Sequence, residues 1–202
     1  YNAGFRMARG EKIIIQNPEC MHVGDLLTHV DNNLDDNKYL VFNCYATDHD
    51  DTHKIYMGQY TPFRDVPPGD GGSCWYNHHA IRPVMYHFAS AITKKNLHEL
   101  GGFDEFYAVG NGFDDDEFLH RIRLKQLSIE PVINDCMVIH QWHETAFNHS
   151  LLDLLERNRS LFNQITTRSN IYTVANHQDL SSDWKFNKIP KIAHFYWGGG
   201  PL

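Results

Sequence analysis

The chain has 202 residues, of which 42% are hydrophobic and 21% charged, proportions that suit one globular domain with a sizeable core. Its net charge of −7 argues against a nucleic-acid-binding protein, which would carry a basic surface. No apolar run approaches the roughly 18 residues of a membrane span, so we expect no transmembrane segment and no signal peptide. The four cysteines contain no CxxC pair and fit neither a zinc site nor a disulfide framework. We therefore expect the reducing cytoplasm, with a membrane-peripheral position there left open.

The first half of the chain alternates apolar runs with polar turns. Short apolar runs predict strands at residues 12–16 and 39–45. The first of these runs has the pattern of a strand buried on both faces of a largely parallel sheet. Two helices are also expected, at residues 2–9 with Gly10 as the cap, and at residues 23–30.

The second half continues the same alternation. Strands are expected at residues 88–93, 129–133 and 136–141, the last two separated by Asn134-Asp135. Helices are expected at residues 114–127 and 150–168, each with apolar side chains at helical spacing. Strands that alternate with helices predict a layered α/β domain.

Four consecutive acids, residues 114–117, open the expected helix at 114–127. Asp114 is placed to be its N-cap, with Glu117 three positions on in capping-box register. One interpretation is a well-capped helix and nothing more, because acids are favoured at the positive end of a helix. Capping needs only two of the four acids, however. Like charges this close raise one another's pKa and the helix terminus lowers it, which is how a carboxylate is prepared as a general base.

This segment resembles the acceptor-side signature of GT-A fold glycosyltransferases, especially the family-two enzymes and the β-1,4-galactosyltransferases. The matching parts are the small-residue strand FASAITKKNL, the turn GGFDE, the loop GNG, the acids DDDEF and then Arg121. The resemblance implies that Asp115 takes the proton from an acceptor sugar hydroxyl and that Asp114, with Asp116 beside it, binds the acceptor. Asp114 stands where the family often has Glu. Arg121 is expected to pair with the acids or to contact a donor phosphate.

A site for the donor and a metal ion is expected just before the helix at residues 23–30. The opening YNAGFRMARGEKIII resembles the lead-in to the family's Asp-X-Asp motif, but Gln16-Asn17-Pro18-Glu19 follows. By position, Glu19 would bind the metal, and Asn17 or Gln16 would contact the ribose of the donor. One carboxylate therefore remains where the family has two. The alternative is that Glu19 is an ordinary loop acid.

A second metal ligand is expected in the segment CMVIHQWHE. His140 follows Met137 by three residues, as does a metal-binding histidine of the galactosyltransferases. In a strand, His140 and His143 would face opposite sides, so we favour His140 alone. A mixed carboxylate and imidazole site suits Mn²⁺ or Mg²⁺ better than a structural zinc.

Residues 47–80 are rich in glycine, proline and polar residues and predict a long irregular loop, of the kind that binds ligands or covers them. Trp75 lies near its end, and a flat aromatic ring suits the face of a sugar, so Trp75 is a candidate acceptor contact. The alternative is that Trp75 belongs to the core.

The resemblance implies a GT-A (Rossmann-like) mixed sheet flanked by helices over residues 1–168, lacking its first strand–helix–strand unit. Residues 169–189 are expected to be a linker, and residues 190–202 resemble the first strand of a second, capsular-type transferase domain. The expected function is inverting, metal-dependent transfer of a sugar from a nucleotide-sugar donor, UDP-linked, to a saccharide acceptor. Two alternatives remain: a non-catalytic sugar-binding module and a metal hydrolase, although the sequence contains no HExxH motif.

Overall fold

A computed structural model describes residues 1–59, 63–69, 71–144, 150–167 and 172–174 of the protein. Within these residues a six-stranded mixed sheet has the order β1-β5-β3-β6-β2, and β4 pairs with β3. Strands β3 and β6 run parallel, whereas the other paired strands are antiparallel. The strands are β1 Lys12–Gln16, β2 Cys20–Val23, β3 Lys38–Ala46, β4 Cys74–Asn77, β5 Ala89–Thr93 and β6 Ser128–His140.

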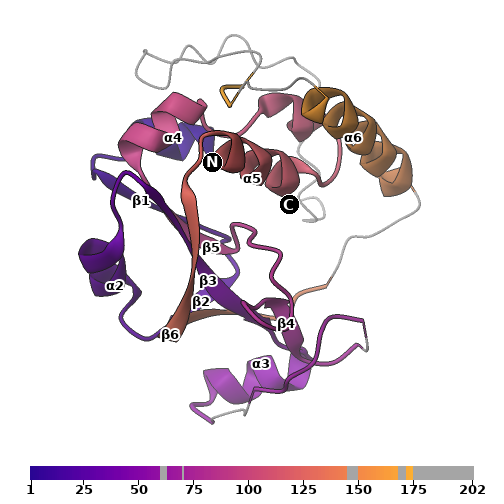
Figure 1. Ribbon diagram of the computed structural model, residues 1–202. Coiled ribbons are helices and arrows are strands. Elements are labelled where there is room, and N and C mark those ends of the chain that lie inside the picture. The colour runs from indigo at the N-terminus through magenta and orange to yellow at the C-terminus, as the bar shows by residue number, and fades with distance from the viewer. Residues whose placement is uncertain (60–62, 70, 145–149, 168–171, 175–202) are drawn as a thin grey trace.

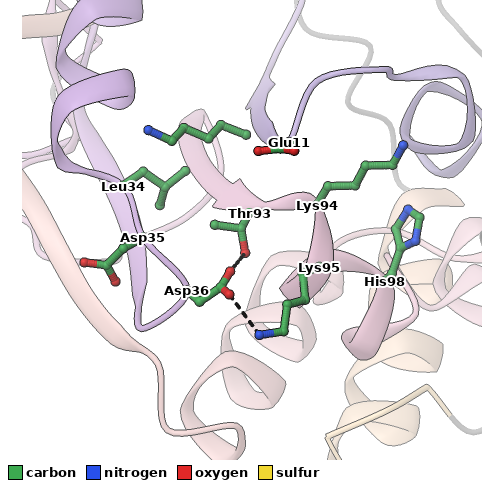
Figure 2. A pocket seen from close by; sticks show the side chains of 9 residues that line it. Glu11, Leu34, Asp35, Asp36, Thr93, Lys94, Lys95 and His98 are labelled. Atoms are coloured by element: carbon green, nitrogen blue, oxygen red, sulfur yellow. Dashed lines mark hydrogen bonds and ion pairs between the residues drawn. The ribbon is translucent and has the colours of Figure 1, made fainter.

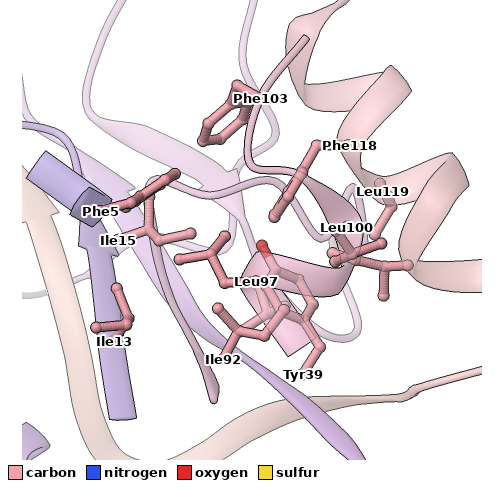
Figure 3. Packing of buried hydrophobic residues seen from close by; sticks show 12 residues of the cluster. Phe5, Ile13, Ile15, Tyr39, Ile92, Leu97, Leu100, Phe103, Phe118 and Leu119 are labelled. Atoms are coloured by element: carbon pink, nitrogen blue, oxygen red, sulfur yellow. The ribbon is translucent and has the colours of Figure 1, made fainter. Parts of the chain in front are cut away.

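Helices lie on both faces of this sheet (Figure 1). Figure 3 shows the core beneath α1, α4 and α5, where Phe5, Leu97 and Phe118 pack against strand residues such as Ile15 and Tyr39. A second core, which includes Leu26 of α2, fills the opposite face. The helices are α1 Asn2–Met7, α2 Leu26–Asn33, α3 His49–Tyr56, α4 Lys94–Leu100, the 3-10 helix η1 Glu105–Val109, α5 Asp114–Leu124 and α6 Ser150–Thr166. The fold is thus the predicted α/β arrangement of a mixed sheet flanked by helices.

The two apolar runs of the first half form strands, but in different surroundings. Every residue of β3 after Lys38 is buried, as expected for a central strand. Strand β1 lies at the edge of the sheet and pairs only with β5, in antiparallel orientation. It buries Ile13 and Ile15 while its other residues are partly exposed. The prediction of a strand buried on both faces of a largely parallel sheet was therefore wrong.

Strand β6 corrects the prediction of two short strands at residues 129–133 and 136–141. It is continuous from Ser128 to His140. Its parallel register with β3 jumps, because Phe42 pairs with Val132 and the next residue, Asn43, pairs with Met137. The Asn134-Asp135 segment thus lies in an irregularity within one strand, since β3 pairs with β6 on both sides of the jump.

Other boundaries also differ from the expectation. Helix α1 ends at Met7 and is followed by extended Ala8, so Gly10 is not its cap. Strand β2 ends at Val23, the first residue of the expected helix 23–30, and α2 starts only after Asp25, whose carboxylate accepts a hydrogen bond from the Thr28 N–H. The expected loop 47–80 contains α3 and β4. The expected linker falls outside the described residues except for 172–174, and the expected strand at 190–202 lies wholly outside them.

Candidate active site

Helix α5 begins at the acid run, but not with the predicted cap. Its N-cap residue is Phe113, in the left-handed conformation at φ 65° and without a side-chain cap. Asp114 is the first helical residue, where its carboxylate accepts hydrogen bonds from the backbone at the helix start. The predicted capping box is therefore absent, and Glu117 points elsewhere.

Glu117 forms a buried ion pair with Arg121. Arg121 donates from Nε and Nη2 to the two carboxylate oxygens, at 2.6 and 2.7 Å. Its guanidinium also donates to the carbonyl oxygens of Leu100 and Gly102, each at 2.8 Å. The Arg121 side chain is only 1% exposed. These contacts tie the Gly-Gly-Phe-Asp turn to α5, so the burial of Arg121 does not support the predicted contact with a donor phosphate.

The three aspartates of the run have different surroundings. Burial raises the pKa of the Asp114 carboxyl, and the negative charge of Asp115 raises it further. Asp115 contacts His87, whose Nδ1 lies against Asp115 Oδ1. Asp116 accepts a hydrogen bond of 2.7 Å from the hydroxyl of Tyr86. His87 was not predicted, because it stands 27 and 28 positions before the two aspartates it meets, a spacing that carries no helical or strand signal.

Glu19 and His140 come together although they are 121 positions apart, with Glu19 Oε1 3.2 Å from His140 Nε2. The cause is the register of β2 with β6, in which Cys20 pairs with His140. Because β6 ends at His140, the alternation that separated His140 from His143 no longer applies. One ligand atom from each of Glu19, His140 and His143 lies within 4.8 Å of the others. His143 is thus an addition to the predicted pair.

The chemistry of these three residues fits a divalent cation. Burial lowers the pKa of the His140 imidazole, against the opposing effect of the Glu19 carboxylate, and a neutral imidazole is the form that binds metals. One carboxylate and two imidazoles suit Mn²⁺ better than Mg²⁺, which prefers oxygen ligands.

Of the predicted donor contacts, Gln16 is the last residue of β1 and Asn17 begins the turn that carries Glu19. Gln16 Nε2 donates to the Cys20 carbonyl at 2.7 Å, and Asn17 Nδ2 lies 3.4 Å from Glu19 Oε1. The backbone N–H of Asn17 donates to the carbonyl of Phe88 at 3.1 Å. Their role toward a donor stays a prediction.

Tyr1 lies between the acid run and the Glu19 cluster. Its hydroxyl donates to Asn17 Oδ1 at 2.6 Å, and its ring meets the His87 ring edge-on at 5.1 Å. Burial raises the pKa of the Tyr1 hydroxyl, and the charges of Asp115, Glu19 and Asp114 raise it further. Tyr1 thus contacts Asn17, which lies beside Glu19, through its hydroxyl, and His87, which lies against Asp115, through its ring.

Trp75 is a core residue in this structure. It is 6% exposed, and its ring packs against those of Tyr45, Phe63 and His78 at centroid distances of 4.9, 5.7 and 4.4 Å. The packing favours the alternative that Trp75 belongs to the core and does not support an acceptor contact.

A pocket of about 580 Å³ lies at the other end of β5, beyond Thr93 (Figure 2). Asp36, one of the residues that line it, accepts hydrogen bonds of 2.8 Å from both Thr93 Oγ1 and Lys95 Nζ. His87 and Phe88 precede the opposite end of the same strand. The pocket is therefore separate from the site around Asp115, and the Asp36 carboxylate in its lining is already paired.

Residues 88–143 match a protein family described as the N-terminal domain of galactosyltransferase. The matched stretch contains the acid run, His140 and His143, but it does not reach Tyr1, Glu19 or His87. A search of curated proteins finds no match. Together with the mixed sheet flanked by helices, the family match supports a glycosyltransferase domain with a GT-A-like fold. None of the helices in the described ranges is long and apolar enough to span a membrane.

Proposed function

We propose that this domain transfers a sugar, with inversion, from a nucleotide-diphosphate donor, UDP-linked, to a saccharide hydroxyl. The observation that carries the proposal is the arrangement of two clusters around Tyr1. Asp114 and Asp115 open α5 on one side, and Glu19, His140 and His143 lie on the other. A general base and a site for a diphosphate-bound cation are the two parts that such a transfer needs.

Asp115 is the proposed base. Its side chain is 29% exposed, so a carboxylate oxygen can meet an acceptor hydroxyl, whereas burial raises the pKa of the Asp114 carboxyl. Asp115 takes the hydroxyl proton as the acceptor oxygen attacks the anomeric carbon. Asp114 and Asp116 are proposed to orient the acceptor, with Tyr86 fixing Asp116 through its hydroxyl.

Glu19, His140 and His143 are the residues that would hold Mn²⁺. A divalent ion bound there would offset the negative charge of the departing nucleoside diphosphate. Asn17 and Gln16 stand beside Glu19 and are proposed to contact the ribose of the donor. The domain is proposed to extend through α6, which contacts the loop before the acids.

The test is release of nucleoside diphosphate, measured with a panel of UDP-sugars and saccharide acceptors, with and without Mn²⁺. We expect Asp115→Asn to lower transfer by about 10²- to 10⁴-fold, the usual contribution of a general base, while Mn²⁺-dependent UDP binding stays near the wild-type level. We expect His140→Ala to weaken that binding. Wild-type turnover by Asp115→Asn would refute the assignment of the base.

One observation favours a second function, a non-catalytic sugar-binding module. The Glu19 cluster supplies a single carboxylate, where the family resemblance implies two acids. Ligand-detected NMR with nucleotide-sugars and with saccharides, each with and without Mn²⁺, separates the two functions. A sugar-binding module would bind saccharides but show no Mn²⁺-dependent binding of a nucleotide-sugar.

A further inference from the structure

His87 is a buried histidine whose ring orientation is set by its neighbours. The residue is 5% exposed and lies immediately before Phe88 and strand β5. Its ring packs against Phe103 at 4.7 Å and against Tyr1 at 5.1 Å, both in edge-to-face geometry. Two aromatic walls at large interplanar angles leave the imidazole little freedom to rotate.

The polar atoms of His87 converge on one oxygen of Asp115. Nδ1 of the imidazole lies against Asp115 Oδ1, and the backbone N–H of His87 points at the same oxygen at 3.4 Å. The His87 side chain is 7% exposed, compared with 29% for Asp115. Both contacts of His87 are therefore made to the same carboxylate oxygen, Oδ1.

The charged and titratable groups around His87 come from separate elements. Asp115 and Asp114 belong to the start of α5, and their ligand atoms lie within 4.8 Å of a ring nitrogen of His87. Tyr1 approaches from the position before α1, and its hydroxyl donates a hydrogen bond to Asn17 Oδ1. Among these groups, Asp115 makes the direct contact with Nδ1. Nδ1 has no partner with hydrogen-bond geometry among the described residues, so its ion-pair contact with Asp115 Oδ1 is the interaction that links the ring to the carboxylate.

We propose that His87 is a positioning residue for Asp115, which fixes Oδ1 so that Oδ2 faces the acceptor hydroxyl. The inference rests on the proposed function and deepens it. During transfer the acceptor O–H bond breaks and its proton goes to Asp115 Oδ2. The acceptor oxygen forms the new bond to the anomeric carbon, and the bond from that carbon to the donor phosphate breaks, its electron pair leaving with the diphosphate. His87 keeps its Nδ1 proton throughout.

Two substitutions separate positioning from packing. His87→Asn keeps an N–H donor near the place of Nδ1, whereas His87→Phe keeps a ring between Tyr1 and Phe103 but has no donor. The exposed His53 on α3 provides a control, His53→Asn. Each variant is assayed for kcat and acceptor KM across the pH range, for Mn²⁺ binding by calorimetry, and for thermal unfolding.

We expect His87→Phe to lower kcat by about 10- to 100-fold, the range that loss of a hydrogen bond to a charged group produces, with a smaller change in acceptor KM. The acidic limb of its pH profile should move to higher pH, because a donor that favours the charged carboxylate is lost. His87→Asn should retain most of the wild-type kcat, and the acidic limb of its pH profile should not shift. His53→Asn should behave as wild type.

Three results would overturn the inference while the proposed function stands. The first is a His87→Phe variant with the wild-type kcat and pH profile. The second is an equal loss of kcat in His87→Phe and His87→Asn that follows a lowered melting temperature. The third is loss of Mn²⁺ binding in His87→Phe, which would indicate a cation site. If the wild-type protein transfers no sugar, the proposed function fails and the positioning role with it. NMR titration of the His87 imidazole then tests whether the contact itself exists. If it does, the titration midpoint should differ between the wild-type protein and Asp115→Asn.

Discussion

A methyl group added at Gly110 would enter space that helix α6 already occupies. Gly110 precedes the acid run by four residues, and Asn158 of α6 packs directly against it. A Cβ on Gly110 would lie 2.7 Å from Asn158 Nδ2 and closer still to Oδ1 and Cγ of the same amide. Asn158 is completely buried, so it cannot turn out into solvent.

The cost of Gly110→Ala follows from what Asn158 does there. Its Nδ2 donates to the carbonyls of Tyr107 and Gly112, at 3.1 and 2.8 Å, and so joins α6 to both sides of the loop. Loss of two such hydrogen bonds costs about 2 kcal/mol. Overpacking adds about 1 to 3 kcal/mol. With partial relaxation of the loop, we expect the free energy of unfolding to fall by about 3 kcal/mol.

Thermal unfolding followed by circular dichroism measures this loss, which corresponds to a melting temperature about 6 to 12 °C lower. The matched control is Gly4→Ala on α1, where an added Cβ meets nothing within 4 Å. There the substitution should raise stability by about 0.5 to 1 kcal/mol, because alanine is the better helix former. The reasoning is refuted if Gly110→Ala melts at the wild-type temperature or if the two variants behave alike.

Two further predictions concern charge. Arg121→Met leaves the buried Glu117 carboxylate unpaired and should lower the free energy of unfolding, measured in urea, by about 3 to 5 kcal/mol. Glu156→Gln breaks an exposed ion pair and should change it by no more than about 0.5 kcal/mol. Similar losses in both variants would contradict the role given to burial. Asp114→Asn should raise the melting temperature at neutral pH. Because the pKa of Asp114 is raised in the folded protein, its charged form lowers stability above that pKa, so the gain should shrink as the pH falls through it. A gain that does not change between pH 4 and 8 would contradict this explanation.

Local pattern in the sequence was sufficient for much of the fold. The apolar runs predicted β1, β3 and β5, and the helical spacing after the acids and after Ser150 predicted α5 and α6. These elements depend on interactions between neighbouring residues and on the alternation of side chains, both of which are legible along the chain. The acid run itself was found in the same way, because four successive acids at a helix start need no tertiary information to be noticed.

The membership and geometry of the candidate site depended on the tertiary structure. Glu19 meets His140 through the register of β2 on β6, and His143 joins them because β6 ends at His140. His87 reaches Asp115 because the segment before β5 passes the start of α5, and Arg121 turns inward because the carbonyls of Leu100 and Gly102 lie beneath it. Each contact joins residues whose separation along the chain carries no periodic signal. Strand register and helix packing are settled by the burial of whole faces, so only the folded chain decides which polar side chains meet.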